Sequence, residues 1–383
     1  MLLHALAAAV LTWQSPIVVA SGAAHRGPWE MNDSDYRWVD DATVAMDQDV
    51  GVAWVDQEKK DLFFQRYDDA NNPRLSGPTN VSKSPSTFTW LPRVAMKGSD
   101  VFLLWQEISF TGGTHGGEIH FARSSDGGAT FSVAVNLSNS KAGDGKGRLG
   151  EGIWDNGSLD LARDEHALYA AWTEYEGTLW LRRSSDGGRT FESAVRLSDH
   201  ARAPSIAIRK NVVLVAWSVA GKEIQLATSS DGGRSFGATR TLFEGDAPKI
   251  AVDSKGTVHL AFARGSEVHY SRDLKSSRRI DRAKFRAGFP ALRVDGHDRV
   301  YALWEEFLAP NEHPRALAFA SSVDDFAAPV PLPSISSPAL GYNGSQQGLL
   351  GSKLAVSPAG AIAIVNSTFR ANVRSQVWLL RSR

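Results

Sequence analysis

Short apolar runs recur in pairs along the whole chain, with a polar turn between the two members of each pair. The first run alternates apolar and small residues, as in TVAM, RVAM, SIAI and KIAV, and the second, such as VAW, LLW or ALW, follows about ten residues later. Turns such as KGSD, DSKG and SPAG separate them. This pattern is typical of β-hairpins. The second runs are anchored at Trp54, Trp105, Trp172, Trp217, Phe262, Trp304 and Val365.

The anchors repeat at spacings of 51, 67, 45, 45, 42 and 61 residues, which indicates seven copies of one unit. A third run follows most anchors, as in EIHFARS, TLWLRRS and EIQLATS, and a fourth short run ends the unit, as in VNLS and VRLS. Repeats of about 40 to 50 residues with four strands are typical of propeller blades. The sequence therefore predicts an all-β fold, a β-propeller of seven four-stranded antiparallel blades.

Three units carry nearly the same octapeptide between their third and fourth runs: SSDGGATF, SSDGGRTF and SSDGGRSF. This pattern predicts a tight turn, because an Asp carboxylate can accept backbone N–H bonds across it and Gly supplies the positive φ. We expect the side chain of the final Phe to pack between two blades. The residues with these structural roles are Ser124, Asp126, Gly128, Phe131, Ser184, Asp186, Gly188, Phe191, Ser229, Asp231, Gly233 and Phe236.

The octapeptides resemble the Asp box of the sialidase-like (BNR-repeat) β-propeller superfamily. Degenerate copies stand at Ser271/Asp273 and at residues 321–326, so the resemblance extends from about residue 40 to the end of the chain. It implies that the boxes are structural rather than functional. It also leaves six blades as the alternative number, because active sialidases are similar to a six-bladed propeller.

Residues 1–24 have two possible roles, and residues 25–383 are expected to form a single propeller domain. The first 13 residues are mostly Leu and Ala, as in a signal peptide, but no Lys or Arg occurs before Arg26 to supply a positive n-region. Alternatively, residues 16–21 (PIVVAS) supply a closing strand, because the chain ends where other units enter their fourth strand. We expect this strand to pair with residues 377–380, since an unpaired last blade would expose its edge.

Composition excludes several function classes. The 42 basic and 42 acidic residues cancel, which argues against the broad positive field of nucleic-acid and anionic-membrane binders. The chain contains no cysteine, so disulfides, thiolate zinc sites and thiol nucleophiles are excluded. No apolar stretch reaches the length of a membrane span. We expect a monomer without a cofactor or a metal, and the sequence HGGEIH at residues 115–120 lacks the helical spacing of a zinc motif.

The long connections all fall on one face of the predicted propeller, since they either link the second strand to the third or link two blades. Insertions gathered on one face of a repeat fold usually mark the binding face. We call this the loop-rich face, and the opposite one the turn face. The long segments are residues 108–117, 139–157, 307–315 and 334–351.

A ring of acidic residues is expected on the loop-rich face, two positions after the anchors. A carboxylate ring could bind sugar hydroxyls or supply an acid/base pair. Alternatively, each acid pairs with a cation at the equivalent first-strand position of a neighbouring blade. The positions after the anchors are Asp56, Glu107, Glu174, Val219, Arg264, Glu306 and Ser367, and the first-strand positions are Thr43, Arg93, Asp160, Ser205, Lys249, Ala291 and Lys353.

Aromatic residues precede several first strands, where they could stack on sugars or wedge blades together. They are Trp38, Trp90, Trp154 and Phe289. Trp154 is the best candidate for stacking, because it lies in a Gly-rich polar segment beside Glu151 and Asp155.

The family resemblance implies what an active sialidase would need: three arginines around the substrate carboxylate, a Tyr nucleophile primed by Glu, and an Asp acid/base. The F/Y-R-I-P sequence of such enzymes is matched only by YRWV at residues 36–39, which lacks Ile-Pro. The remaining catalytic candidates are Tyr342, Glu151, Arg37, Arg264 and Arg370.

The sequence therefore favours an extracytoplasmic binding module, secreted or periplasmic, for a glycan or a protein ligand on the loop-rich face. The alternative is an exo-sialidase-like glycoside hydrolase with a Tyr nucleophile. The expected ligand contacts are Glu107, Glu151, Trp154, Glu174, Arg264, Glu306 and Tyr342.

Overall fold

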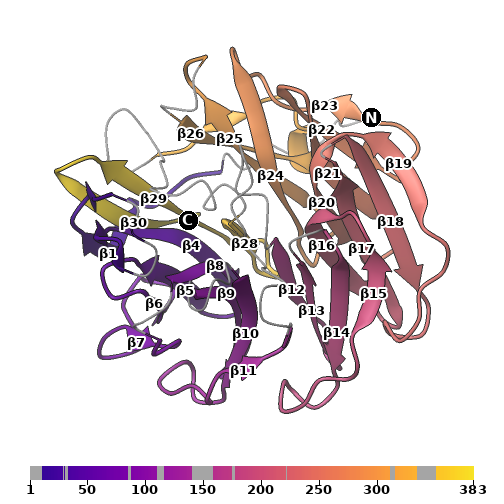
Figure 1. Cartoon of the computed structure of the whole chain (residues 1–383). Helices are drawn as coiled ribbons and strands as arrows, with labels where there is room; N and C mark the ends of the chain where they lie inside the picture. The colour runs from indigo at the N-terminus through magenta and orange to yellow at the C-terminus, as the bar shows by residue number, and fades with distance from the viewer. Residues whose placement is uncertain are drawn as a thin grey trace.

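The computed structural model is an all-β ring of seven four-stranded antiparallel sheets (Figure 1). It describes residues 11–28, 30, 33–84, 88–109, 116–139, 158–174, 177–220, 222–310, 315–333 and 351–383. The prediction of a seven-bladed propeller is confirmed, and the alternative of six blades is wrong. Among these residues no helix is long and apolar enough to span a membrane.

Each of the first six blades is a meander of four consecutive strands, the first at the centre of the ring. The first blade contains β4 (Val39–Met46), β5 (Val50–Asp56), β6 (Asp61–Tyr67) and β7 (Thr79–Asn80), and the second contains β8 (Phe88–Lys97), β9 (Asp100–Ser109), β10 (Gly116–Ser124) and β11 (Val135–Asn136). The third contains β12 (Leu159–Arg163), β13 (Leu168–Thr173), β14 (Leu179–Ser184) and β15 (Val195–Ser198), and the fourth contains β16 (Arg202–Arg209), β17 (Val212–Val219), β18 (Glu223–Ser229) and β19 (Arg240–Glu244). The fifth contains β20 (Asp246–Val252), β21 (Val258–Arg264), β22 (Glu267–Arg272) and β23 (Arg278–Arg279), and the sixth contains β24 (Arg286–Val294), β25 (Val300–Phe307), β26 (Arg315–Ser321) and β27 (Val330–Pro331).

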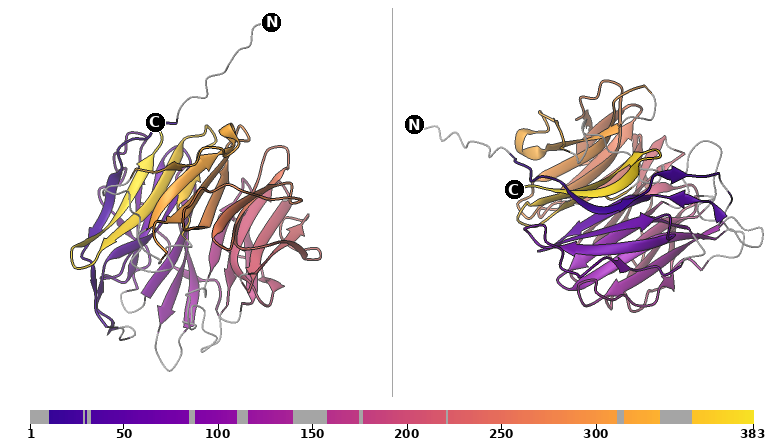
Figure 2. Two further views of the ribbon diagram at one scale, coloured as in Figure 1. Left: turned by 90° about the horizontal axis from the view of Figure 1, so that it is seen from above. Right: turned by 90° about the vertical axis from the view of Figure 1, so that its left-hand side faces the viewer.

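The seventh blade combines the two ends of the chain. Its strands are β28 (Leu354–Val356), β29 (Ile362–Arg370), β30 (Arg374–Arg381) and, from the N-terminus, β1 (Ile17–Gly22), which pairs antiparallel with β30. Figure 2 shows the indigo β1 beside the yellow C-terminal strands. The predicted closing strand is therefore present, and the last blade has a partner along its outer edge. A further short pair, β2 (His25–Arg26) with β3 (Tyr36–Arg37), precedes the first blade.

The anchor residues form the centres of the hydrophobic core. All seven anchors are buried, and the side chains of Trp105, Trp172, Trp217 and Trp304 are among the largest fully buried ones. They contribute to apolar clusters that join neighbouring blades. Burying such large side chains supplies much of the apolar area that stabilises a repeat fold.

The octapeptides form turns with one shared set of hydrogen bonds. In the second blade, Ser124 donates to Asp126 Oδ1, and Thr130 donates through its backbone N–H and its hydroxyl to the same carboxylate. Gly128 has φ +95°, and an added Cβ would lie 2.2 Å from Phe64 of the preceding blade. Phe131 packs edge-on against Phe64, with 5.7 Å between ring centroids. The turn chemistry predicted from the sequence is therefore found, and the turns fasten adjacent blades together.

The inner strands share a kink that the sequence pattern did not predict. Five of them contain a β-bulge in which a residue other than Gly has a φ near +50°. In four blades the next residue is Pro, giving the tripeptides LPR, APS, APK and FPA. The left-handed residues are Asp41, Leu91, Ala203, Ala247 and Phe289.

Candidate functional site

The bulges place one residue of each of these five inner strands at the start of the central channel, on the loop-rich side. Bulges redirect side chains and are common beside functional sites. Directly after the Ala247-Pro248 bulge comes Lys249, which lines both the channel and a narrow space at its entrance. A left-handed conformation is costly for residues other than Gly, so its repetition around the channel indicates that the fold holds these positions firmly.

The channel contains a cavity of about 340 Å³. Its wall is formed by β12, β16, β20 and β24, together with residues 351–352 before β28. Its polar side chains are those of Asp160, Arg163, Ser205, Lys249, Arg293 and Ser352. Such a cavity is large enough for several waters or for a small polar group of a ligand.

Lys249 is the cation in this cavity that has no partner. Its ammonium makes no hydrogen bond or ion pair within the described part of the chain, whereas Arg293 donates to the Ser352 hydroxyl at 2.8 Å and to the Leu292 carbonyl. Burial lowers the pKa of Lys249 to about 8; Asp160 opposes this change, while Arg93 and Arg293 add to it. The ammonium is therefore desolvated but still mostly charged at pH 7.

Asp160 is the acid that faces these cations, and it is already engaged. Its Oδ2 accepts the Ile206 backbone N–H at 2.8 Å. Burial lowers the pKa values of Arg93 and Arg293, and Asp160 opposes the change in both. With Lys249 and Arg293 on one side and Asp160 on the other, this part of the cavity carries an excess of positive charge and can attract an anionic group.

In a second buried charge cluster the cations share a carboxylate. Lys353, at the entrance to β28, donates to Glu305 of β25, and Arg315 of β26 lies 3.8 Å from the same carboxylate. All three side chains are almost completely buried. The predicted pairing of a first-strand cation with a neighbouring acid thus occurs here, but the acid is Glu305 rather than Glu306.

Glu107 lies in a hydrogen-bonded cluster near the loop-rich face. Its Oε1 accepts from the Ser84 hydroxyl at 2.7 Å and from Trp105 Nε1 at 3.0 Å, and its Oε2 lies 3.8 Å from His120 Nε2. Glu118 opposes Glu107 on the next strand and accepts from the Ser138 hydroxyl. Among the described residues no group of three or more side chains forms a metal site.

Glu306 differs from the other acids of the predicted ring. It is half-buried and accepts no hydrogen bond from any residue that the structure describes, and its pKa is raised, mainly by burial and further by Asp281. Asp56, in contrast, accepts the N–H groups of Glu58 and Lys59 in its own turn and pairs with the Lys59 ammonium. Glu174 lies at a turn, where its backbone N–H donates to Thr178.

The three arginines considered for a carboxylate clamp have separate surroundings. Arg37 pairs with the exposed Asp35, and Arg264 donates to the Glu244 carbonyl. Arg370 lies at the exposed end of β29. Arg37 and Arg264 therefore have different acceptors.

Two of the described aromatic residues before the first strands serve as wedges, whereas Phe289 is partly exposed and lines the narrow space at the channel entrance. Trp38 and Trp90 are 4% exposed and belong to one apolar cluster, and Trp38 donates to Asp40 at 2.8 Å. Neither offers a surface for sugar stacking. The candidates Glu151, Trp154 and Tyr342 lie outside the described residues.

The described cavity depends on residues that the sequence pattern did not single out as ligand contacts. The sequence pattern placed Asp160 and Lys249 only at the first-strand positions that could pair with the acidic ring, and it assigned no role to Arg293. The repeated tripeptides with a central Pro were the available signal, because Pro within a strand marks an edge or a bulge.

Comparison with known proteins supports the fold without identifying the activity. No protein-family model matches the sequence, and no curated protein matches it. Among solved structures, an ulvan lyase of a polysaccharide lyase family is similar with a TM-score of 0.58 and 11% identity, over 96% of this chain and 97% of that one.

Two glycosidases are also similar in structure. The α-L-arabinofuranosidase of Fusarium graminearum gives a TM-score of 0.52 at 12% identity, covering 82% of this chain and 99% of that one. The sialidase of Trypanosoma rangeli gives 0.50 at 13% identity, covering 80% of this chain but only 59% of its own length. The chain thus spans about three fifths of that sialidase. It has the fold of the sialidase-like β-propellers, which these carbohydrate-active proteins share.

Proposed function

We propose that this protein binds a glycan bearing carboxylate or sulfate groups, on the loop-rich face at the mouth of the central channel. Recognition is local: one acidic group of the glycan approaches the channel cations, while the rest of the sugar chain contacts the surrounding loops. This differs from the broad electrostatic attraction that the zero net charge argues against. We propose that the protein acts outside the cytoplasm, in a secreted or periplasmic location.

The observation that carries this proposal is the unpaired Lys249 ammonium beside Arg293 in a cavity of about 340 Å³. An isolated buried ammonium is costly, and the cost falls when an anion or ordered water reaches it. An anionic group of a ligand that reaches Lys249 and Arg293 would offset this cost.

The names of the structural neighbours support the choice of ligand class. One ulvan lyase structure is bound to a GlcA(1-4)Rha3S unit, which carries a carboxylate and a sulfate. A T. rangeli sialidase structure contains sialic acid, which is also anionic. The contacts expected from the sequence complete the proposed site: Glu107, Glu151, Trp154, Glu174, Arg264, Glu306 and Tyr342.

A glycan array with matched acidic and neutral oligosaccharides tests the ligand class. We expect the protein to bind glycans that bear uronate, sialate or sulfate groups and not to bind their neutral counterparts. Trp154→Ala should weaken binding about fivefold or more, through loss of a stacking surface. Binding to neutral glycans alone would contradict the proposal.

Glycoside cleavage is the second candidate, and Glu306 is the observation that favours it. Glu306 is a half-buried carboxyl with a raised pKa, and a raised pKa favours the protonated form that a general acid needs. A fluorogenic sialoside assay and an acidic-polysaccharide depolymerisation assay test this alternative. If Tyr342→Phe or Glu306→Gln abolishes turnover, the replaced residue takes part in catalysis. If turnover is unchanged in both variants, neither residue is catalytic.

A further inference from the structure

The turn face contains a second polar cavity, on the face opposite to the predicted ligand contacts. It is a groove of about 500 Å³ between the fifth and sixth blades. The β20–β21 and β24–β25 turns form one side of it, with Asp253, Lys255 and Asp298, and the turn after β22 forms the other. All the lining residues belong to the described part of the chain.

The groove lies where the octapeptide has degenerated. In the fifth blade the aligned residues are SRDLKSSR, so Leu274 and Lys275 replace the two glycines and Arg278 replaces the final Phe. In the sixth blade the segment 321–326 is two residues shorter and has no Gly. The intact turns press their second Gly against the preceding blade, as Gly188 does against Phe121. Neither of the two turns that border the groove can pack in this way.

A rigid aromatic floor underlies the groove. Tyr270 and Phe326 have ring centroids 4.7 Å apart, one ring from each blade. The Tyr270 hydroxyl lies 2.7 Å from His259 Nδ1, and His259 Nε2 lies 3.4 Å from Asp253 Oδ2. Burial lowers the pKa of His259 and raises that of Tyr270 to about 12, so both groups are neutral at pH 7.

The carboxylates that line the groove already have donors. Asp253 accepts the N–H groups of Lys255 and Thr257, and Asp298 accepts both the N–H and the hydroxyl of Ser254. Asp325 accepts from Arg278. The groove therefore has little remaining capacity to accept hydrogen bonds from a ligand.

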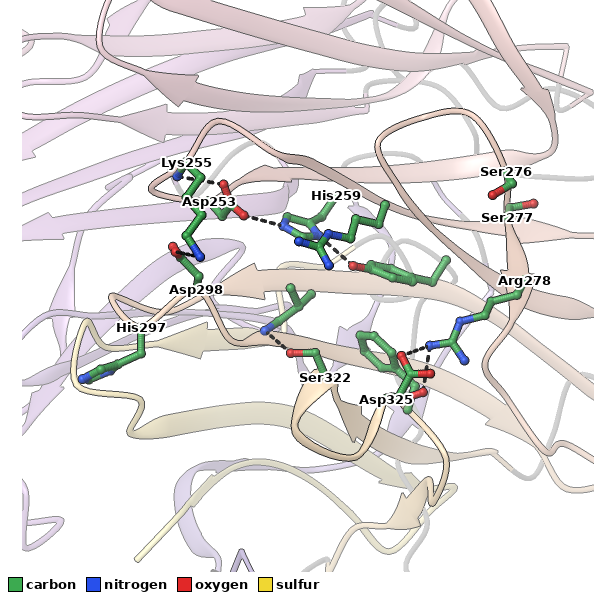
Figure 3. A pocket seen from close by; sticks show the side chains of 14 residues that line it. Asp253, Lys255, His259, Ser276, Ser277, Arg278, His297, Asp298, Ser322 and Asp325 are labelled. Atoms are coloured by element: carbon green, nitrogen blue, oxygen red, sulfur yellow. Dashed lines mark hydrogen bonds and ion pairs between the residues drawn. The ribbon is translucent and has the colours of Figure 1, made fainter. Parts of the chain in front are cut away.

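Several donors, in contrast, remain available. Figure 3 shows Ser276, Ser277 and Arg278 on one side of the groove, opposite Asp253, Lys255 and Asp298. Within the described chain, Arg272 and the hydroxyls of Ser276 and Ser277 have no hydrogen-bond partner. Arg272 also lies close enough to His259 and Tyr270 to lower the pKa of both, which places its charge over the floor.

We propose that this groove binds a tetrahedral oxyanion, a sulfate or phosphate group that is either free or an ester on a sugar. Arg272 supplies an unpaired guanidinium, and Arg278 supplies the N–H groups that its pairing with Asp325 leaves unused. Ser276 and Ser277 supply hydroxyls, and the aromatic floor contacts the apolar face of the ester. Guanidinium groups suit oxyanions because their N–H donors match the spacing of the oxygens. This site is independent of the proposed glycan site on the loop-rich face.

Calorimetric titration of the full-length protein at constant ionic strength tests the groove. Inorganic sulfate and inorganic phosphate are the first probes, and glucose 6-sulfate and glucose 6-phosphate show whether an ester is preferred. We expect saturable binding of one oxyanion at the groove, weakened about tenfold by Arg272→Gln and abolished by Ser277→Asp. Arg272 is exposed and unpaired, so its replacement should leave the melting temperature unchanged.

Two control variants test whether a cation outside the groove binds the oxyanion. Arg240→Gln removes an equally exposed arginine from β19 outside the groove, and Lys249→Gln removes the channel ammonium. Both should leave oxyanion binding at the groove unchanged. Absence of saturable binding, equal weakening by Arg240→Gln, or binding lost in Lys249→Gln but retained in Arg272→Gln would overturn the proposal.

Discussion

Ile17, in the N-terminal strand, lies directly opposite Leu379 in the last strand of the chain. The pairing continues beyond β1, since the Gln14 N–H donates to the Arg381 carbonyl and the Arg383 N–H to the Thr12 carbonyl. Ile17 and Leu379 also belong to the apolar side-chain cluster between the seventh and first blades. One segment thus both covers a sheet edge and helps to close the ring.

Amide hydrogen exchange should report this closure. Peptides covering residues 17–22 should exchange slowly, at a rate close to that of β30, because both strands share one hydrogen-bonded ladder. Val133, which is 89% exposed and lies outside the strands, serves as a fast-exchanging reference. Fast exchange throughout residues 17–22, or a mature N-terminus that begins after Gly22, would refute the closure.

Removing the carboxylate from one octapeptide turn should cost stability but not binding. Asp186 accepts the backbone N–H groups of Arg189 and Thr190 and the hydroxyls of Ser184 and Thr190. Asp186→Ala should lower the free energy of unfolding by about 1–3 kcal/mol. Denaturant titration gives this value. Weaker glycan binding by a variant that melts at the wild-type temperature would contradict the structural role.

The octapeptide carboxylates should also contribute to acid sensitivity. Hydrogen bonds, first from Ser124 and then from Thr130, lower the pKa of Asp126 to about 2. An unfolded Asp has a pKa of about 3.9, so the stabilisation is nearly complete at about pH 5 and is lost as the pH falls through 4 towards 2. The stability difference between wild type and Asp126→Asn should therefore shrink between pH 5 and pH 3. A difference that stays constant over this range would argue against the stabilising role of the charge.

The fold could be predicted from the sequence because each blade repeats the same local signals. Buried anchors such as Trp217 and turns such as SSDGGRSF are properties of short segments, and their spacing fixes the number of blades. Even the long-range pairing of β1 followed from counting strands in the last unit. The wedge role of Trp38 and Trp90 was left open, because a sequence does not show which face of an aromatic ring is covered.

The site was less predictable, because it depends on which inner-strand side chains point to the axis. The bulge at Ala247-Pro248 shifts the register of β20 by one residue and brings Lys249 to the channel. Period-two alternation alone assigns such residues to the wrong face. Glu306 was predicted as a member of an acid ring, but its raised pKa arises from three-dimensional surroundings, namely burial and the nearby Asp281.

Replacing Lys249 with an apolar residue should stabilise the protein. Its folded pKa of about 8 lies below the value of about 10.4 in an unfolded chain, so the unfolded state binds more protons and stability rises with pH between 8 and 10. At pH 7 the buried charge costs up to about 3 kcal/mol, which Lys249→Met should recover. Denaturant unfolding at pH 7 and pH 10 should show a gain that is larger at pH 7. A less stable variant at pH 7 would show that Lys249 has a structural partner.

The most direct test of the account is the pH dependence of binding to a glucuronate-containing oligosaccharide, measured by calorimetry against a neutral oligosaccharide of equal length. We predict that wild-type affinity falls about tenfold from pH 7 to pH 9 as the Lys249 ammonium loses its proton, and that Lys249→Arg holds its affinity over the same range. Lys249→Gln should bind weakly at every pH, whereas Lys222→Gln, which alters an exposed lysine on the same face, should follow the wild type. Affinity that does not change with pH in the wild type, or wild-type binding by Lys249→Gln, would contradict the proposal that the channel recognises an acidic group of the glycan.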